Sequence, residues 1–253
     1  MSDLSGKTII VTGAGGSIGR AAALILARRG ANVVVADIVE AAAEETVRLI
    51  RAEGGNAVYS HCDVSIEDNA WSTVELAITE FGRLDGAFNN AGLPPVSVPL
   101  HQLTSADFQR SLDINVLGVF HCMKHQIAAM LKAGSGGSIV NTASVGGTVA
   151  IPAQGEYVAA KHAVIGLTRI AAVDYGQQGI RVNAVLPGAI RTPMLMSVIE
   201  NDPSHAEFLK TAHPIGRYGE PAEIGETAAW LLSDASSFVT GAAIAADGGY
   251  TAI

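Results

Sequence analysis

Tyr157 and Lys161 are the residues whose types and spacing point most directly to chemistry. They stand four positions apart, so on a helix both side chains lie on one face. A phenol with a reference pKa of about 10 is a poor base at neutral pH, but a close ammonium group stabilises the phenolate and lowers that pKa. The pair predicts a proton relay. On spacing alone, a purely structural role carries equal weight, because Tyr-x-x-x-Lys occurs by chance in many proteins.

Ser144 adds a third polar group. It stands 13 residues before Tyr157 and follows Asn141-Thr142-Ala143 just past a predicted strand end. There its hydroxyl can hydrogen-bond a substrate oxygen while Tyr157 moves the proton.

A glycine-rich segment follows the first predicted strand and opens a helix. It reads Thr12-Gly13-Ala14-Gly15-Gly16-Ser17-Ile18-Gly19-Arg20. Such a loop lets backbone N–H groups approach a pyrophosphate at the positive end of the helix dipole, where a Cβ would be in the way. The alternative is a merely tight strand-to-helix turn, because a glycine-rich stretch alone is a weak signal.

Asp37 ends the second predicted strand, 18 residues after Gly19. A carboxylate there accepts hydrogen bonds from the adenosine ribose hydroxyls and repels a 2′-phosphate. Ile38 follows, with no adjacent Arg or Lys to neutralise a phosphate. The segment therefore favours NAD over NADP, and the alternative is that Asp37 only caps the next helix.

The elements that position these residues alternate between strands and helices. β-branched runs at about 8–11 and 33–35 enclose an Ala/Leu-rich helix. We expect further strands at about 56–60, 84–88, 138–142, 180–186 and 242–246, and helices at about 39–53, 66–81, 104–131, 155–177 and 221–233. This pattern predicts an α/β fold with a parallel sheet and helices on both faces, as one doubly wound (Rossmann) domain over 1–253.

Residues 189–219 break this regularity. They contain prolines, methionines and histidines without a clear period, which predicts a substrate-covering lid. Within it, Met194, Leu195 and Met196 either line a pliable apolar pocket or pack the lid onto the core.

The composition limits the partners. The 253 residues are 49% hydrophobic and 16% charged, with a net charge of −8 and dispersed Lys and Arg. This argues against nucleic acid or an anionic membrane as a partner and favours a small molecule. The two cysteines form no disulfide framework and the N-terminal residues lack signal-peptide character, so we expect a cytoplasmic protein.

The motifs together resemble the classical short-chain dehydrogenase/reductase family over essentially the whole chain. In family order they are Thr12-Gly13 with Gly19, Asp63-Val64, Asn89-Asn90-Ala91-Gly92, Asn115, Ser144, Tyr157 with Lys161, Pro187-Gly188 with Thr192, and Asp247-Gly248-Gly249. This order removes coincidence as an alternative for the Tyr–Lys pair. The resemblance implies a homotetramer, and the apolar helices 104–131 and 155–177 also favour subunit packing.

The resemblance also implies roles for individual residues. Tyr157 is similar to the family's acid/base, Ser144 to its oxyanion partner, and Lys161 to the ribose-binding group that lowers the tyrosine pKa. Asn115 is similar to the anchor of a water chain that feeds Lys161.

For the cofactor, NAD, the implied contacts lie along the whole chain. Asp63 and Val64 hold the adenine, Asn90 the backbone beside the adenosine ribose, and Ile190 and Thr192 the nicotinamide carboxamide. The full set is Gly13, Ser17, Ile18, Gly19, Asp37, Asp63, Val64, Asn90, Tyr157, Lys161, Pro187, Gly188, Ile190 and Thr192. One departure is Ser17, which stands where the family usually has glycine; we expect it to cap the helix and donate to a phosphate.

Some segments look most like those of the bacterial dichlorocyclohexadienediol dehydrogenases. They are 86–90, 155–164 and 213–217. With the small and apolar residues at 145–152, they predict a cyclic or bulky apolar secondary alcohol as substrate. Arg191 and Arg217 are the nearby cations, and we expect both to face solvent or acidic partners.

The sequence therefore predicts an NAD-dependent oxidoreductase that interconverts a secondary alcohol and its ketone, with Tyr157 as acid/base. The alternatives are a 3-oxoacyl-thioester reductase, which would normally prefer NADPH, and a non-catalytic dinucleotide-sensing protein, which would typically lose Tyr, Lys or Ser. We predict no metal site, because His121 and His125 lack further ligands at metal spacing. His213 is expected to face solvent more readily than to line the pocket.

Overall fold

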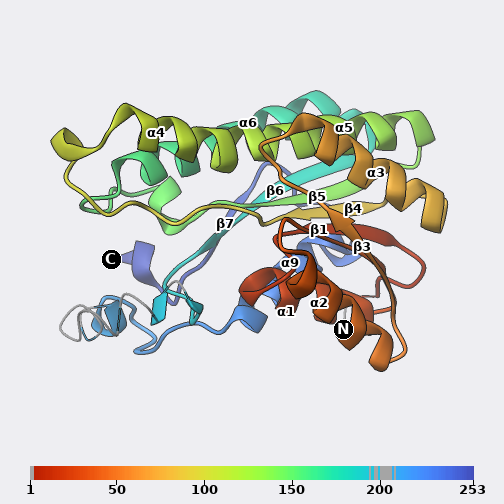
Figure 1. Ribbon diagram of the computed structural model, residues 1–253, viewed down its shortest axis with the longest axis horizontal. Coiled ribbons are helices and arrows are strands. Elements are labelled where there is room, and N and C mark those ends of the chain that lie inside the picture. The colour runs from red at the N-terminus through yellow and green to blue at the C-terminus, as the bar shows by residue number, and fades with distance from the viewer. Residues whose placement is uncertain (1–2, 194, 197–198, 200–206, 208) are drawn as a thin grey trace.

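The described residues form a seven-stranded parallel sheet with helices on both faces (Figure 1). This computed structural model describes residues 3–193, 195–196, 199, 207 and 209–253. The strand order is β3-β2-β1-β4-β5-β6-β7. The bounds are β1 Thr8–Thr12, β2 Asn32–Asp37, β3 Asn56–His61, β4 Gly86–Asn89, β5 Gly137–Thr142, β6 Ile180–Pro187 and β7 Ala243–Ala246. The predicted doubly wound α/β fold is confirmed, and the direction of winding reverses between β1 and β4.

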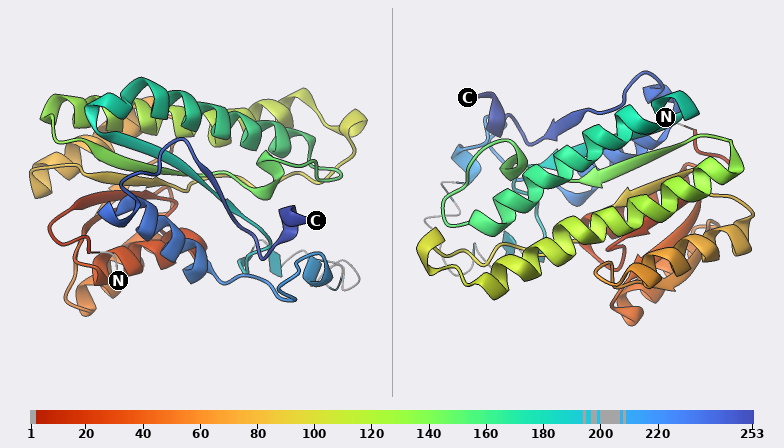
Figure 2. Two further views of the ribbon diagram at one scale, coloured as in Figure 1. Left: turned by 180° about the vertical axis from the view of Figure 1, so that it is seen from behind. Right: turned by 90° about the horizontal axis from the view of Figure 1, so that it is seen from above.

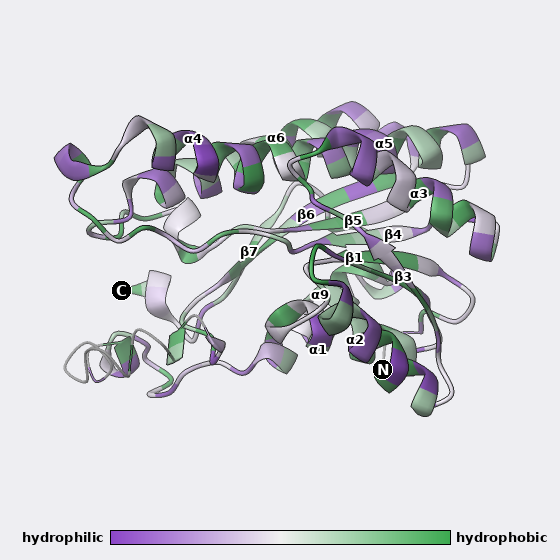
Figure 3. Cartoon of the chain, viewed as in Figure 1, coloured by the Kyte–Doolittle hydropathy of each residue, from purple (hydrophilic) through white to green (hydrophobic). Residues whose placement is uncertain are grey.

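The helices form two layers. One face of the sheet is covered by α1 (Ser17–Arg28), α2 (Glu40–Ala52) and α9 (Pro221–Leu232), and the other by α3 (Glu67–Phe81), α5 (Gly118–Ala133) and α6 (Gly155–Tyr175) (Figures 1 and 2). Alternate strand residues serve the two cores, because Ile10 packs toward α3 whereas Ile9 and Val11 pack toward α1. Each helix carries both hydrophilic and hydrophobic residues (Figure 3), as expected of helices with one face on a sheet.

The predicted helix 104–131 contains a segment of different winding. It consists of α4 (Ser105–Leu112), a π-helical segment (Asp113–Leu117) and α5. A π-turn inserts one extra residue, which hydrophobic periodicity does not reveal. At the centre of this segment Asn115 is fully buried, and its Oδ1 accepts the N–H of Leu93 at 2.9 Å. The predicted helix is present over Ser105–Ala133, but the π-helical segment within it was not predicted, and this segment places Asn115 beside the residues that follow β4.

The other predicted elements agree with the structure to within two residues at each boundary. Most of the undescribed residues fall in the predicted lid, 189–219, so the lid as a whole and the role of Met194 lie outside the described residues. No helix in the described part of the chain is long and apolar enough to cross a membrane.

Candidate active site

The predicted site residues gather at the carboxyl ends of the strands, next to the reversal between β1 and β4. Gly13 directly follows β1, Asn90 follows β4, Ser144 follows β5 by two residues, and Gly188 directly follows β6. Ligands of open α/β sheets bind at this edge, outside the strand ends at the switch point. The fold thus brings together residues that are far apart in sequence.

Ser144, Tyr157 and Lys161 form the centre of this site. Ser144 is buried, and its Oγ accepts the N–H of Gly146 at 3.1 Å. Helix α6 begins at Gly155, so Tyr157 lies in its first turn and Lys161 one turn later. Lys161 Nζ donates to the carbonyl oxygen of Thr142 at 2.9 Å and lies 5.4 Å from the centre of the Tyr157 ring. The three side chains therefore meet, as their types and spacing predict.

Burial shifts both titrating groups toward their neutral forms. It raises the pKa of Tyr157, and the hydrogen bond with Ser144 opposes that rise. It lowers the pKa of Lys161 to about 8, so the ammonium form still dominates at neutral pH. Ser144 is thus the partner that lowers the pKa of Tyr157 in this structure. The further lowering of the Tyr157 pKa that we expect from Lys161 stays a prediction.

Asn115 and Lys161 face the same space beside Gly92. A Cβ on Gly92 would stand 2.7 Å from Asn115 Oδ1 and 3.6 Å from Lys161 Nζ. On its other side, Asn115 Nδ2 donates to Ser111 Oγ at 3.2 Å. Glycine at position 92 therefore leaves room between the amide and the ammonium group, where the predicted water chain would run.

The glycine loop between β1 and α1 fits a dinucleotide phosphate. Gly13 has φ +64°, and a Cβ on Gly19 would clash with the carbonyl oxygen of Gly13. Both glycines are therefore required by the backbone itself. A Cβ on Gly16 would meet nothing within 4 Å, so there is open space beside the residue that precedes α1. The first backbone N–H groups of α1 are accessible to an anion there.

Asp37 lies beside this loop. Its Oδ2 accepts the N–H of Gly15 at 2.8 Å, and its Oδ1 accepts the N–H of Val39 at 2.9 Å. Because Val39 is itself the N-cap of α2, the reading of Asp37 as the cap of that helix is wrong. Each carboxylate oxygen has a second lone pair, so Asp37 retains capacity to accept from ribose hydroxyls.

Ser17 does not cap helix α1, and its expected hydrogen bond to a phosphate stays a prediction. Its φ is +47°, in the left-handed region that favours glycine, the residue the family usually has at this position. The N-cap of α1 is Gly16, and no side-chain hydrogen bond caps this helix within the described residues. The expected Ser17 cap is therefore wrong, because α1 begins at Ser17 and a capping residue precedes the first helical one.

The residues predicted beside adenine and its ribose are held by the chain itself. Asp63 Oδ1 accepts from the N–H and the hydroxyl of Ser65 at 3.0 and 2.6 Å. Asn90 donates its N–H to Thr12 Oγ1 at 3.0 Å and its Nδ2 to the Thr12 carbonyl at 3.2 Å. Val64 is buried, and its carbonyl oxygen lies 3.0 Å from His121 Nδ1. The loops after β1, β3 and β4 are thus fixed before any cofactor binds.

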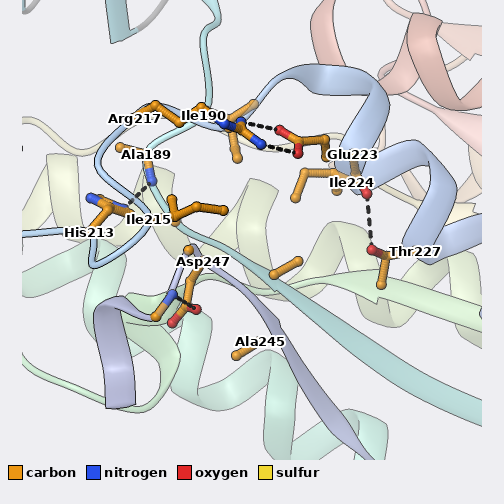
Figure 4. A pocket seen from close by; sticks show the side chains of 15 residues that line it. Ala189, Ile190, His213, Ile215, Arg217, Glu223, Ile224, Thr227, Ala245 and Asp247 are labelled. Carbon is orange, nitrogen blue, oxygen red and sulfur yellow. Dashed lines mark hydrogen bonds and ion pairs between the residues drawn. The ribbon is translucent and has the colours of Figure 1, made fainter. Parts of the chain in front are cut away.

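Beyond Pro187, the chain borders a cavity of about 330 Å³ (Figure 4). Its lining includes Gly188, Ile190 and His213, and neither Ser144, Tyr157 nor Lys161 contributes to it. Ile190 pairs with Gly219 in an isolated parallel bridge. Thr192 Oγ1 accepts the N–H of Leu195 at 3.3 Å. This cavity therefore lies at the base of the predicted lid and includes Gly188 and Ile190, two of the predicted cofactor contacts.

His213 corrects a prediction in the same region. It is 3% exposed, so the solvent-facing reading is wrong. Its Nε2 accepts the N–H of Ala189 at 3.0 Å, and its Nδ1 lies 2.5 Å from the carbonyl oxygen of Leu209. These bonds fix the imidazole as the Nδ1–H tautomer, which ties residue 189 to the segment before His213.

The two arginines near the predicted lid are paired with glutamates, as expected. Arg191 Nε lies 2.9 Å from Glu220 Oε1. Arg217 forms a bidentate salt bridge with Glu223, in which Nη1 and Nη2 donate to the two carboxylate oxygens at 2.8 and 2.7 Å (Figure 4).

His121 and His125 bond within the chain. Besides the His121 contact with Val64, His125 Nε2 lies 3.1 Å from Glu67 Oε1. In the part of the chain that the structure describes, no group of three His, Cys, Asp or Glu side chains is arranged to hold a metal ion.

Comparison with known proteins identifies the family. The family model described as enoyl-(acyl carrier protein) reductase matches residues 13–251. The 2,5-dichloro-2,5-cyclohexadiene-1,4-diol dehydrogenase of Sphingobium indicum is 56% identical over 253 residues, 100% of both chains. The chain belongs to the short-chain dehydrogenase/reductase family.

Two further members of this short-chain dehydrogenase/reductase family are similar over nearly their whole length. The cyclohexanol dehydrogenase of an Acinetobacter sp. (strain SE19) is 44% identical over 97% of this chain and 95% of that protein. The crystal structure of carveol dehydrogenase from Mycobacterium avium in complex with NAD matches with a TM-score of 0.94 and 32% identity, over 100% of both chains.

Sequence reasoning did not predict the roles of two residues that hold this dehydrogenase/reductase site together. Thr12 Oγ1 accepts the N–H groups of both Asn90 and Ala91, each at 3.0 Å. A hydroxyl at the end of an apolar strand, just before the glycine loop, was the available signal. Glu156 is 1% exposed directly beside Tyr157, and nothing in the local pattern separates it from a surface glutamate.

The left-handed backbone at Ser17 yields a prediction about stability. Ser17→Gly should leave the free energy of unfolding unchanged or raise it by up to about 1 kcal/mol, because relief of strain is partly offset by the greater freedom of the unfolded chain. Ser17→Val should lower it by about 1–3 kcal/mol, because a β-branched residue resists positive φ. Urea unfolding of the three proteins measures this order, and a Val variant as stable as the Gly variant would contradict it.

Proposed function

We propose that this short-chain dehydrogenase/reductase uses NAD to interconvert a secondary alcohol, cyclic or bulky and largely apolar, and its ketone. One observation carries the proposal. In the buried cluster after β5, Ser144 acts to lower the pKa of the Tyr157 phenol, and Lys161 Nζ lies 5.4 Å from the centre of the Tyr157 ring. These are the groups that a carbinol oxidation requires: an acid/base, a hydrogen-bond donor for the substrate oxygen, and a cation that favours the phenolate.

Each residue of the catalytic cluster has its own role in the proposed reaction. Ser144 hydrogen-bonds the substrate oxygen and holds it beside the phenol. Tyr157 takes the hydroxyl proton during oxidation and returns it during reduction. Lys161 stabilises the phenolate, and Asn115 holds water next to Lys161 Nζ. When bound, NAD supplies the hydride acceptor.

The loop and Asp37 support NAD as the cofactor. The glycines leave the start of α1 open to phosphate, and Asp37 has free lone pairs at the end of β2. An added 2′-phosphate would face this carboxylate without a cation at position 38 or 39. The NAD in the related carveol dehydrogenase structure agrees with this choice.

The substrate class follows from the walls of the site. Val145, Gly146 and Gly147 are buried next to Ser144 and offer no charge. Arg191 and Arg217, near the predicted lid, are engaged by glutamates, and Lys161 Nζ is engaged by the Thr142 carbonyl oxygen. An apolar site with one Ser and one Tyr fixes a single oxygen but gives a carboxylate or phosphate no partner. The names of the cyclic diol and cyclohexanol relatives support a ring substrate.

Two other activities fit less well. An acyl-thioester reductase accords with the description of the matching family model, but Asp37 and a net charge of −8 disfavour NADPH and an acidic carrier protein. A dinucleotide sensor without turnover would have no need of an assembled Ser144, Tyr157 and Lys161 cluster.

We also propose a homotetramer in the cytoplasm. On the outer face of α5 and α6 large apolar side chains are exposed, and Val173 reaches 78% exposure. A surface of this kind favours burial against a second subunit. The exposed members are Phe120, Leu131, Ile170 and Val173, with Leu117 at the end of the π-helical segment. Light scattering should give the mass of four chains, and a single-chain mass would exclude the assembly.

The substrate proposal is tested with a panel of alcohols and NAD. The panel holds cyclohexanols, cyclohexenediols, steroid alcohols, hydroxy acids and hydroxyacyl thioesters, and NADH formation is followed by absorbance. We expect the cyclic alcohols to give the highest kcat/KM. If a hydroxy acid or thioester wins by more than about tenfold, or about 1.4 kcal/mol, an arginine reaches the site and the proposal is wrong.

The cofactor proposal is tested at Asp37. The kcat/KM with NAD should exceed that with NADP by at least about two orders of magnitude, or roughly 2.7 kcal/mol. Asp37→Ala should narrow this ratio, because it removes both the ribose contact and the repulsion of a 2′-phosphate. Equal values for the two cofactors in the unmodified protein would refute the role of Asp37.

A further inference from the structure

Glu156 is a buried acid that has no assigned role in the catalytic cluster or in the cofactor loop. It precedes Tyr157 in the first turn of α6 and is 1% exposed. Its Oε1 accepts the N–H of Val96 at 2.6 Å. Its Oε2 is buried and has no hydrogen-bond partner in the part of the chain that the structure describes. A buried carboxyl oxygen without a partner is costly, so the molecule should supply one in solution.

A cavity of about 190 Å³ supplies the place for that partner. It is bounded by the segment 93–96, by Glu156, and by Asp107, Arg110 and Ser111 of α4. Arg110 is exposed, so the cavity reaches the protein surface. A polar cavity needs only roughly 10–15 Å³ for one water molecule, so this one has room for several. Asp107 and Arg110 are the charged groups that line it besides Glu156.

Polar groups connect this cavity to the catalytic cluster. Ser111, at its wall, accepts a hydrogen bond from Asn115 Nδ2 at 3.2 Å. Asn115 Oδ1 and Lys161 Nζ both border the open space beside Gly92. Lys161 in turn faces the ring of Tyr157. The sequence of groups from the phenol outward is Tyr157, Lys161, Asn115, Ser111 and Glu156, and water completes hydrogen-bonded contact where these groups are too far apart.

We propose that Glu156 and this cavity form the proton exit of the enzyme, an inference that rests on the proposed alcohol oxidation. The alcohol O–H bond breaks and its proton goes to the Tyr157 oxygen, while the electron pair of the carbinol C–H bond leaves as hydride to NAD. A proton then passes through Lys161 and water to the Glu156 carboxylate. Glu156 releases it through the cavity to a base in bulk solvent, which regenerates the carboxylate. In the reverse direction the same groups deliver the proton.

Glu156→Gln separates this role from a structural one. The amide keeps the size of the side chain and an oxygen for the Val96 N–H, but it cannot take up a proton. In weakly buffered solution, kcat for oxidation should fall at least about tenfold, because an acid/base group has been removed from the path. Imidazole added at rising concentration should restore kcat, whereas the unmodified enzyme should not respond. Glu75→Gln, which removes an exposed acid on α3, serves as the matched control and should change nothing.

A second measurement does not depend on turnover. A high-resolution crystal structure of the protein without cofactor should show ordered water within hydrogen-bond distance of Glu156 Oε2, and a dry cavity would overturn the proposal. If Glu156→Gln raises KM alone and imidazole does not restore activity, Glu156 only positions the segment 93–96 and the proposal is wrong. If the Gln variant fails to fold, Ser111→Ala must show the same buffer dependence. An unmodified protein that oxidises no alcohol refutes the proposed function instead, and the crystal structure still decides the water content of the cavity.

Discussion

The buried ammonium group of Lys161 is the feature on which the rest of the site depends. It is held at 2.9 Å by the carbonyl oxygen of Thr142, the last residue of β5, and burial lowers its pKa to about 8. Burial alone raises the pKa of Tyr157, which would leave the phenol protonated and useless as a base. A cation next to the ring and the hydrogen bond with Ser144 are the two influences that can reverse this. The catalytic capacity of the site therefore lies in how the fold keeps a cation buried.

Several local features of the fold, among them the π-helical segment and Gly92, shape the surroundings of Lys161. The π-helical segment turns Asn115 inward, where it binds the backbone of Leu93 and faces Lys161 across Gly92. A side chain at Gly92 would occupy the space between the amide and the ammonium group. Glu156 fixes the next part of the same segment through Val96. The backbone after β4 is thus held at two points, by one residue from each of the helices that carry the catalytic groups.

Much of this could be predicted from the sequence because it follows from periodicity and from side-chain type. Apolar strand segments that alternate with helices predict the parallel sheet. The four-residue spacing of Tyr157 and Lys161 places both on one face of a helix. What could not be predicted depends on tertiary contacts. The π-turn at Asn115 leaves no periodic trace, the cap expected at Ser17 is displaced by one residue, and the burial of His213 results from bonds to Ala189 and Leu209. Glu156 looks like a surface residue until α4 and the segment 93–96 are packed over it.

The pH dependence of alcohol oxidation in the unmodified enzyme and in Lys161→Ala tests the central claim most directly. Oxidation needs the phenolate, so kcat/KM should rise from neutral toward alkaline pH as the Tyr157–Lys161 pair titrates. Without the ammonium group, burial raises the pKa of Tyr157 unopposed by a cation, and the inflection should move to higher pH or disappear. An inflection at the same pH in both proteins would contradict the account, because Lys161 would then have no part in setting the base.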